Sequence, residues 1–471
     1  MNHQTADVTI STGTIRGVTE GAIARYLGIP YAEPPVGERR FAAPVARKPW
    51  QGVREATEFG PTASQSAYQG ALATLLASVS IPGDDVLTLN VWAPVNAKSA
   101  PVVVWIHGGA LERGAAALPS YDGTAFARDG VVFVSINYRL GAEGFSVLEG
   151  APRNIGLLDA GAALTWVRRE IAAFGGDPSR ITLMGESAGG TLVAALLARR
   201  STRSLVARAI IESGPLEVST TKKAARATTA LAKKLGIPAT REAFLAVSAE
   251  ELVQARIEIT RGGTLLSGTA GFALTTDPDT LPLSPHTVLP HIDTPLLIGT
   301  NTDEYRLWLT PEAIADIGAF KASAARLALK IPYKAAAAAK SAWVGSSHGE
   351  VLGQLLTDKV LRGPATTVAG VKSSSTFMYE FAWQSPVRGL GAAHALEIGF
   401  IFDTLDASDS ISLVGENAPQ LLANEMHRSW VAFITGGDPG WPAYRPQRLT
   451  RVFDAASVTR PQRRTAIVDA L

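Results

Sequence analysis

Residues 181–191 read Ile-Thr-Leu-Met-Gly-Glu-Ser-Ala-Gly-Gly-Thr, an apolar run followed by a turn with glycines on both sides of a serine. The apolar residues 181–184 predict a buried strand, and a helix-like stretch follows through Arg199. Between them lies Gly-x-Ser-x-Gly, the pattern of a sharp turn that exposes a serine hydroxyl, so Ser187 is the predicted nucleophile. Gly185 and Gly189 fit this turn because side chains there would clash with neighbouring backbone. An ordinary serine in a glycine-containing turn is the alternative, because the bare pattern also occurs by chance.

The composition is that of a globular protein with a large core. Hydrophobic residues make up 46% of the 471 residues and charged residues 18%, which excludes a disordered chain. The length fits either about three average domains or one α/β unit with long insertions. The net charge is +2, and the basic pairs are short and scattered, as expected of a solvated surface. No basic stripe with interleaved aromatic residues occurs, so we expect no nucleic-acid partner.

The sequence contains no cysteine. This excludes disulfides, thiolate metal sites and a cysteine nucleophile, and it suits a reducing compartment, so we predict a cytoplasmic protein. Residues 1–13 have neither the basic start nor the apolar middle of a secretory signal, and no apolar run reaches about 18 residues. We therefore expect neither export nor a membrane span. Residues 71–82 form the apolar stretch that most resembles a membrane segment, but it is too short to cross a bilayer, and we interpret it as a helix or a flap.

Short apolar runs alternate with helical patterns between residues 85 and 215, which predicts an α/β fold with a mostly parallel central sheet flanked by helices. Apolar residues at three- and four-residue spacing predict an amphipathic helix that ends at Gly175, with Asn154 as its N-cap. The predicted strands cover residues 86–93, 101–106, 131–137, 181–184, 209–212, 295–299 and 375–381.

After residue 215 the segments are rich in alanine and charge, and we expect them to insert into the sheet topology or to cap it. The alanine run at residues 335–339 favours a helix over a linker, because alanine is the best helix former. No interior linker and no internal repeat is visible, so we predict one unit over residues 1–471 with helical insertions at roughly 221–290 and 310–372. The predicted helices cover residues 221–235, 241–256, 321–329, 333–343 and 418–434.

A serine nucleophile requires a base, usually a histidine that a carboxylate orients. In α/β-hydrolases the acid and the histidine follow the serine in the chain, so both are expected after residue 187. We favour His394, because the Gly391-Ala392-Ala393 loop before it allows close approach to the strand ends. The predicted strand 295–299 leads to Asp303 and Glu304, and spacing alone does not choose between these carboxylates. The other histidines after residue 187 are His286, His291, His348 and His427.

The oxyanion of an acyl-transfer intermediate needs preorganised backbone donors. His107-Gly108-Gly109-Ala110 follows the strand 101–106, where lipases and esterases carry such a loop. The N–H of Ala188 completes the predicted oxyanion hole at a helix N-terminus, whose dipole favours negative charge. We interpret His107 as a structural residue that shapes the loop rather than as the catalytic base.

The chain resembles the type-B carboxylesterases, a family that includes bacterial p-nitrobenzyl esterases, liver carboxylesterases and cholinesterases. Several ordered motifs carry the resemblance along nearly the whole chain. The resemblance implies the α/β-hydrolase fold and the hydrolysis of carboxylic esters. The matching motifs are Leu-Gly-Ile-Pro-Tyr-Ala (27–32), Asp-Val-Leu-Thr-Leu-Asn-Val-Trp (85–92), Asn-Tyr-Arg-Leu-Gly (137–141), Asn-Ile-Gly-Leu-Leu-Asp (154–159), Phe-Gly-Gly-Asp-Pro (174–178), His-Ala-Leu-Glu (394–397) and Gly-Asp-Pro (437–439).

Carried over residue by residue, the resemblance implies a catalytic triad of Ser187, His394 and Glu304. It thereby chooses Glu304 over Asp303. It also implies an oxyanion hole formed by the backbone N–H groups of Gly109, Ala110 and Ala188. Gly108 is expected to support the turn of the oxyanion loop, and Glu186 to be a buried partner behind the nucleophile.

The departures from the family pattern lie around the predicted pocket. Ala110 replaces a third oxyanion glycine but keeps its N–H. Val86 replaces a cysteine that is disulfide-bonded in secreted relatives, which agrees with the cytoplasmic prediction. Other departures put any transfer of substrate preference from relatives in doubt. The residues expected to border the substrate pocket are Leu111, Glu112, Arg113, Tyr305 and Trp308, the last of which fits core packing equally well.

The sequence thus predicts a serine carboxylic-ester hydrolase that forms an acyl-enzyme, with a small-molecule ester and water as its substrates. No metal or organic cofactor is expected, because no His-Glu-x-x-His segment and no pair of histidines at ligand spacing occurs. One alternative is the same triad acting mainly on carbamate or amide bonds. A second alternative is a non-catalytic binding protein of the cholinesterase type. The sequence leaves the natural ester, the pocket depth and the oligomeric state open.

Overall fold

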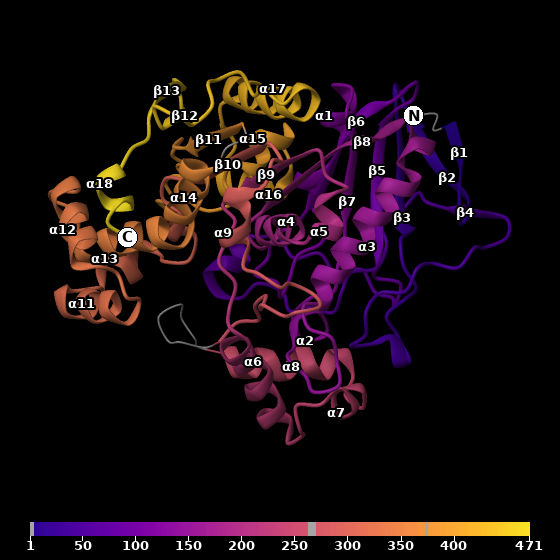
Figure 1. The fold of residues 1–471 in the computed structure, drawn as a ribbon, viewed down its shortest axis with the longest axis horizontal. Coiled ribbons are helices and arrows are strands. Elements are labelled where there is room, and N and C mark those ends of the chain that lie inside the picture. The colour runs from indigo at the N-terminus through magenta and orange to yellow at the C-terminus, as the bar shows by residue number, and fades with distance from the viewer. Residues whose placement is uncertain (1–3, 262–269, 373–374) are drawn as a thin grey trace.

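The computed structural model describes residues 4–261, 270–372 and 375–471, and it is built around one large twisted sheet (Figure 1). The strand order is β1-β2-β3-β5-β7-β6-β8-β9-β10-β11-β12-β13, and β4 pairs with β2. All pairs from β7 to β12 are parallel, whereas the other pairs in this strand order are antiparallel, and β4 pairs with β2 in parallel. The strands are β1 (Gln4–Ile10), β2 (Gly13–Glu20), β3 (Ile23–Pro30), β4 (Val53–Glu55), β5 (Thr88–Pro94), β6 (Ala100–Ile106), β7 (Val132–Ile136), β8 (Gly176–Glu186), β9 (Arg208–Glu212), β10 (Leu296–Asn301), β11 (Thr376–Phe381), β12 (Leu449–Phe453) and β13 (Val458–Pro461).

The central strands are apolar on both faces because helices cover both faces of the sheet. In β6, Val102 and Val104 belong to one core cluster, while Val103 and Trp105 belong to the other. Successive side chains of a strand point to opposite faces, so one strand supplies both cores. This explains why the central strands read as continuous apolar runs rather than as alternating ones.

Different helices cover the two faces. The first core cluster contains residues of α3 (Ile155–Glu170) and α4 (Ala188–Ala198), and the second contains residues of α1 (Thr124–Arg128), α15 (Ile398–Phe402) and α17 (Gln420–Gly436). Because α4 begins directly after β8, it lies against the sheet and directs its N-terminus at the carboxyl ends of the parallel strands. This arrangement places Ser187 at that edge.

Two groups of helices lie away from the sheet (Figure 1), one around α6–α8 and the other around α11–α13 and α18. All of these helices except α18, which lies near the C-terminus, fall within the segments predicted as insertions, and residues 262–269 of the first segment lie outside the described residues. The remaining helices are α2 (Gly141–Phe145), α5 (Arg200–Arg203), α6 (Thr221–Leu235), α7 (Arg241–Leu245), α8 (Ala249–Thr260), α9 (Pro285–Val288), α10 (Pro311–Ala315), α11 (Ala319–Ala328), α12 (Tyr333–Ala342), α13 (His348–Thr357), α14 (Gly363–Val371), α16 (Ser408–Val414) and α18 (Thr465–Val468).

The structure differs from the sequence predictions in two helices. The predicted helix 241–256 is two helices, α7 and α8, because Ser248 forms a capping box with Glu251 that starts α8 anew. Asn154 precedes α3 but does not cap it with its side chain. Its side chain instead donates to Thr275 O and accepts from Thr275 N, so it anchors a distant segment.

Short tight helices supplement the regular ones, and the stretch 71–82 is mostly irregular after a short 3-10 helix. Within the described residues, no helix is both long and apolar enough to cross a bilayer. The 3-10 segments are Gly37–Arg39, Gly70–Thr74, Pro119–Tyr121, Ile171–Phe174, Leu289–His291 and Glu304–Leu307, and Asp358–Arg362 forms a π-helical turn.

Candidate active site

Ser187 lies on the turn between β8 and α4 with φ +55° and ψ −121°, a strained conformation for a residue with a side chain. Its N–H donates to Glu212 O on the neighbouring strand β9 at 2.9 Å. A Cβ on Gly189 would lie 1.9 Å from Ile106 O, and one on Gly185 would lie 2.7 Å from Gly189 O. The turn therefore requires glycine at both positions, as the sequence predicts.

Glu304 and His394 meet next to this turn although they are far apart in the chain. Glu304 begins a 3-10 helix after β10, and His394 lies on the loop that leads to α15. His394 Nδ1 is 2.5 Å from Glu304 Oε2. The other oxygen, Glu304 Oε1, accepts from Ser213 Oγ at 2.6 Å and from Asn301 N at 2.7 Å. Both oxygens of the carboxylate are thus fixed, which fixes the plane of the imidazole.

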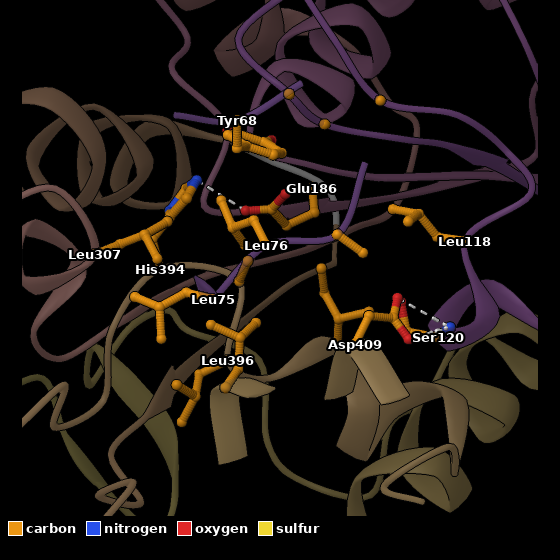
Figure 2. Close-up of a pocket in the computed structure, with 18 of the residues that line it drawn as sticks. Tyr68, Leu75, Leu76, Leu118, Ser120, Glu186, Leu307, His394, Leu396 and Asp409 are labelled. Carbon is orange, nitrogen blue, oxygen red and sulfur yellow. Dashed lines mark hydrogen bonds and ion pairs between the residues drawn. The ribbon is translucent and has the colours of Figure 1, made fainter. Parts of the chain in front are cut away.

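The other ring nitrogen of His394 faces Glu186, the residue before the predicted nucleophile (Figure 2). His394 Nε2 is 2.9 Å from Glu186 Oε1, and both side chains are buried. No hydrogen bond joins the described side chains of Ser187 and His394, although both residues line the same two cavities. Hydrogen bonds of catalytic groups are often long in ligand-free structures and tighten when substrate binds.

Burial and neighbouring charges shift the pKa values of these groups. Burial lowers the pKa of His394, but the carboxylates of Glu186 and Glu304 outweigh burial and raise it well above its ordinary value. Burial raises the pKa of Glu186, and the charge of His394 opposes that rise. Burial, together with the charges of Glu186 and Glu304, raises the pKa of Glu397 to about 8. The site therefore combines one imidazole with several carboxyl groups, of which Glu397 carries a proton at neutral pH.

Asp303, the alternative acid left open by the spacing, points away from His394. Its Oδ1 accepts from Gln354 Nε2 at 2.6 Å, and its Oδ2 accepts from Ala392 N at 3.1 Å. The backbone N–H of Asp303 also donates to Ala392 O at 2.8 Å. Asp303 thus fastens the loop that carries His394 to the turn that carries Glu304. Of the two carboxylates, only Glu304 contacts the imidazole.

The backbone N–H groups of Gly109, Ala110 and Ala188 have no acceptor among the described residues. Gly109 has a φ of +106°, and a Cβ there would lie 2.0 Å from Arg113 O, so the loop requires glycine. Ala110 also has a positive φ, at +57°. A Cβ on Gly108 would lie 2.6 Å from Glu186 Oε2 and 3.1 Å from Ser187 Cβ, so this loop packs directly against the serine turn.

The remaining histidines are placed elsewhere or have other partners. His107 is buried, its Nδ1 is 2.8 Å from Gly108 O, and its ring stacks on Tyr138. Burial lowers the pKa of His107 to about 4, so the ring is neutral, which suits the predicted structural role. His427 binds Ile401 O and Asp129. Neither cavity at Ser187 is lined by His286, His291, His348 or His427.

Two cavities meet at Ser187, and both are lined by Ala110, Ser187, Trp308 and His394. The first, which we call the Tyr68 cavity, has a volume of about 220 Å³. The second, which we call the Phe272 cavity, has a volume of about 480 Å³. The Tyr68 cavity is also lined by Tyr68, Leu72, Leu75, Leu76, Leu118, Glu186, Leu396 and Asp409 (Figure 2), and the Phe272 cavity by Leu111, Ala188, Ser213, Phe272, Leu274, Tyr305, Leu309 and Leu361.

The residues predicted to border the pocket divide between these cavities, with one exception. Leu111 and Tyr305 line the Phe272 cavity, Arg113 lines the Tyr68 cavity, and Trp308 lines both, with its ring centroid 4.6 Å from that of His394. Glu112 lines neither of the two. Its side chain turns away from Ser187 to form an ion pair with Arg256, so the prediction of a pocket residue is wrong at this position.

The chain is similar to known proteins along nearly its whole length. The model of the carboxylesterase family matches residues 4–455. The chain belongs to the carboxylesterase family. It is 35% identical to the para-nitrobenzyl esterase of Bacillus subtilis (strain 168), over 97% of this chain and 96% of that protein. It is 34% identical to the phenmedipham hydrolase of Pseudarthrobacter oxydans, over 92% of each chain.

Solved structures of carboxylesterases have the same fold. A PNB esterase superposes with a TM-score of 0.88 over 99% of both chains at 34% identity. Carboxylesterase EST55 of Geobacillus stearothermophilus superposes with a TM-score of 0.87 over 98% of this chain and 99% of that one, also at 34% identity. The predicted family, the α/β-hydrolase fold and the class of carboxylic-ester hydrolase are therefore confirmed.

Several residues of this site were not predicted from the sequence. Ser213 follows β9 directly. Because sites form at the carboxyl ends of parallel strands, its position after the strand next to β8 could have identified it. Glu397 belongs to the His-Ala-Leu-Glu motif, but its hydrogen-bond partner Asn301 is distant in the chain. No local sequence pattern therefore indicates that Glu397 is part of the site. Tyr68, Phe272 and Arg256 come from segments without a motif. No cluster of metal-ligating side chains occurs within the part of the chain that the structure describes.

Proposed function

We propose that this carboxylesterase cleaves esters through Ser187 as nucleophile, His394 as general base and then acid, and Glu304 as the carboxylate of the triad. The observation that carries the proposal is the 2.5 Å contact between His394 Nδ1 and Glu304 Oε2, formed beside the strained turn of Ser187. This contact keeps the proton on Nδ1, so Nε2 is the nitrogen that takes the proton of the serine hydroxyl once it turns from Glu186 Oε1, 2.9 Å away, to Ser187.

In the first half of the reaction, Ser187 Oγ attacks the ester carbonyl carbon while its proton passes to His394 Nε2. The carbonyl oxygen becomes an oxyanion that accepts hydrogen bonds from the N–H groups of Gly109, Ala110 and Ala188. The carbon–oxygen bond to the alcohol then breaks, and His394 returns the proton to the leaving oxygen. The products are the free alcohol and an acyl ester of Ser187.

In the second half, water attacks the acyl carbon while His394 Nε2 takes its proton. The acyl bond to Ser187 Oγ breaks, and the proton returns to the serine, so the carboxylic acid leaves and the enzyme is restored. Throughout, Glu304 stabilises the protonated imidazole without itself taking a proton. Since every atom comes from the ester, the protein or water, the cycle proceeds without a cofactor.

The two cavities receive the two halves of the ester. His394 Nε2 faces Glu186, which lines the Tyr68 cavity, and the leaving oxygen takes its proton from this nitrogen. We therefore assign the alcohol group to the Tyr68 cavity and the acyl group to the larger Phe272 cavity. The lining of the Phe272 cavity is mostly aliphatic and aromatic, which suits an apolar acyl chain.

The decisive experiment compares Ser187→Ala with the wild type on p-nitrophenyl acetate and with a fluorescent phosphonate probe. The variant is expected to stay folded, to lose nearly all turnover and to lose labelling. Ser146→Ala is the matched control, because Ser146 is another buried serine that lines neither cavity at Ser187, and it is expected to keep turnover and labelling. Wild-type turnover or labelling in Ser187→Ala would refute the assignment.

A matched set of an ester, a carbamate and an anilide tests the preferred bond. The same triad passes through similar tetrahedral intermediates with all three, and we expect the highest kcat/KM for the ester. A non-catalytic binding role is disfavoured because every triad position is filled, and failure of the phosphonate to label folded wild-type protein would favour it. One unit over residues 1–471 and a cytoplasmic location remain predictions.

A further inference from the structure

The oxyanion loop carries two adjacent charged residues, Glu112 and Arg113, that reach in opposite directions. Both backbone N–H groups donate to Gly109 O, at 3.1 Å and 3.0 Å, so the two residues belong to the same tight turn as the oxyanion donors. Beyond the turn, each side chain contacts a segment that lines only one of the two cavities. The loop thus connects mechanically to both halves of the substrate pocket.

Glu112 holds the wall of the Phe272 cavity. Arg256 on α8 donates to both of its oxygens, Nε at 3.1 Å and Nη2 at 2.7 Å, and both side chains are mostly buried. The backbone N–H of Phe272 donates to Glu112 Oε1 at 3.4 Å. The Arg256 guanidinium also lies over the Phe272 ring, 5.3 Å from its centroid. A two-pronged ion pair of this kind fixes orientation as well as distance, so the position of Phe272 depends on Glu112.

Arg113 holds the wall of the Tyr68 cavity. It donates from Nη2 to Ser66 Oγ at 3.0 Å and from Nε to Ser66 O at 3.3 Å. Its guanidinium lies over the Tyr68 ring, 5.0 Å from the centroid, where the π-face attracts a cation. Next to it, the Gln65 side-chain amide pairs with the backbone of Gly114 in both directions, at 2.7 Å and 2.9 Å. Residues 65–68 are therefore tied to the oxyanion loop through Arg113 and Gly114.

We infer that Glu112 and Arg113 are separate specificity-determining residues, one for each half of the ester. Glu112, although it lines neither cavity at Ser187, sets the preference for the acyl group by positioning Phe272. Arg113 sets the preference for the alcohol group by positioning Tyr68. This inference rests on the proposed function only in naming which cavity takes which half of the ester.

The test uses two substrate series with the full-length enzyme. The acyl series is p-nitrophenyl acetate, butyrate, hexanoate and octanoate, and the alcohol series is the acetates of ethanol, butanol, benzyl alcohol and 1-naphthol. Glu112→Gln should change the ratio of kcat/KM for octanoate over acetate by about fivefold or more, since pocket contacts change discrimination by such factors. The ratios in its alcohol series should stay unchanged. Arg113→Gln should show the opposite pattern.

Arg256→Gln and Ser66→Ala are the second variants, since each removes the other half of one contact and should reproduce the corresponding pattern. Glu425→Gln is the matched control, because it breaks the ion pair of 2.6 Å with Arg451 between α17 and β12, away from both cavities. Active-site titration with the phosphonate gives the concentration of active enzyme, and thermal unfolding shows whether each variant is folded. Together they distinguish a change in kcat/KM from a loss of folded protein.

The outcomes separate the inference from the proposed function. An equal fall of kcat/KM across both series would mean that the residues act through the oxyanion donors, and it would overturn the inference. Ratios that stay constant in both series would overturn it as well. If Glu112→Gln changes only the alcohol series and Arg113→Gln only the acyl series, the inference stands and the assignment of the cavities is reversed. Loss of phosphonate labelling in the wild type would refute the proposed function alone.

Discussion

His394 Nε2 and Glu186 Oε1 lie 2.9 Å apart, so the imidazole is held between two carboxylates rather than one. Burial disfavours the charged ring, but the two carboxylates reverse this effect and raise the pKa of His394. The nitrogen that serves as base in the proposed mechanism is therefore partnered by the residue next to the nucleophile. We therefore expect Glu186 to influence the pH at which this base becomes available.

Glu186→Gln removes one of the two negative charges that raise the pKa of His394. The pKa of the imidazole should fall, so the neutral base should persist to lower pH. We expect the acid limb of the pH profile of kcat/KM to move to lower pH in this variant, as measured with an uncharged ester between pH 5 and 9. A limb that stays in place or moves to higher pH would contradict this role.

The pKa of Glu397 is raised to about 8, mainly by burial, so the carboxyl group is protonated in the folded protein at neutral pH. In the unfolded chain it loses its proton near the ordinary value of 4.5, and this difference lowers stability as pH rises from about 4.5 to about 8. Glu397→Gln removes the titration while keeping the shape. The unfolding midpoint of the variant relative to the wild type should rise across this pH window and level off above it. Thermal unfolding at several pH values measures the difference, and a constant difference would contradict the raised pKa.

Glu304→Gln leaves the imidazole without a charged partner. We expect kcat to fall by about three orders of magnitude while the fold is preserved, since the triad carboxylate stabilises the imidazolium. Asp303→Asn should act more weakly, by about tenfold, because the amide oxygen still accepts some of the hydrogen bonds made to the carboxylate and the loop shifts only slightly. Steady-state kinetics on one ester compares the two variants. A larger loss in Asp303→Asn would assign the triad acid to Asp303.

Gly189→Ala should destabilise the fold strongly, because its Cβ would lie 1.9 Å from the backbone oxygen of Ile106, which has no room to yield. Overpacking typically costs about 1–3 kcal/mol and occasionally more, and so close a contact with backbone places this variant at the upper end. Gly370→Ala is the matched control, since a Cβ there meets nothing within 4 Å and the residue lies within α14. Chemical denaturation of both variants gives the free energies. Equal stabilities would show that the turn tolerates a side chain.

The sequence predicted the parts of the fold that depend on local patterns. Continuous apolar runs gave β6, β8 and β10, because strands covered on both faces need no polar alternation. The terminal strands such as β1 and β13 were missed, because antiparallel strands at the ends of a sheet are half exposed and polar in sequence. The break between α7 and α8 at Ser248 was also missed. The apolar pattern continues across this residue, whereas the capping box that starts α8 involves only Ser248 and Glu251.

The candidate site was predictable where a motif fixes the backbone, as at Ser187 and the loop before Ala110. The choice of Glu304 over Asp303 came from the family resemblance, because adjacent carboxylates on one turn differ only in direction. Glu112 was expected to border the substrate pocket, but its side chain pairs with Arg256 and lines neither cavity at Ser187. Its partner Arg256 lies 144 residues away, and no spacing rule connects them. Long-range pairs of side chains are what the sequence leaves undecided.

Asp303 is part of a chain of hydrogen bonds that extends from the loop of His394 to residues outside both cavities. Arg464 Nη1 donates to Gln354 Oε1 at 2.7 Å, Gln354 Nε2 donates to Asp303 Oδ1, and Asp303 Oδ2 accepts from Ala392 N two residues before His394. A relay of three contacts thus links α13 and the segment before α18 to the base. Random libraries at positions 354 and 464 should therefore yield clones with altered turnover and an unaltered substrate range. Redesign of the cavity walls, by contrast, changes the substrate range itself.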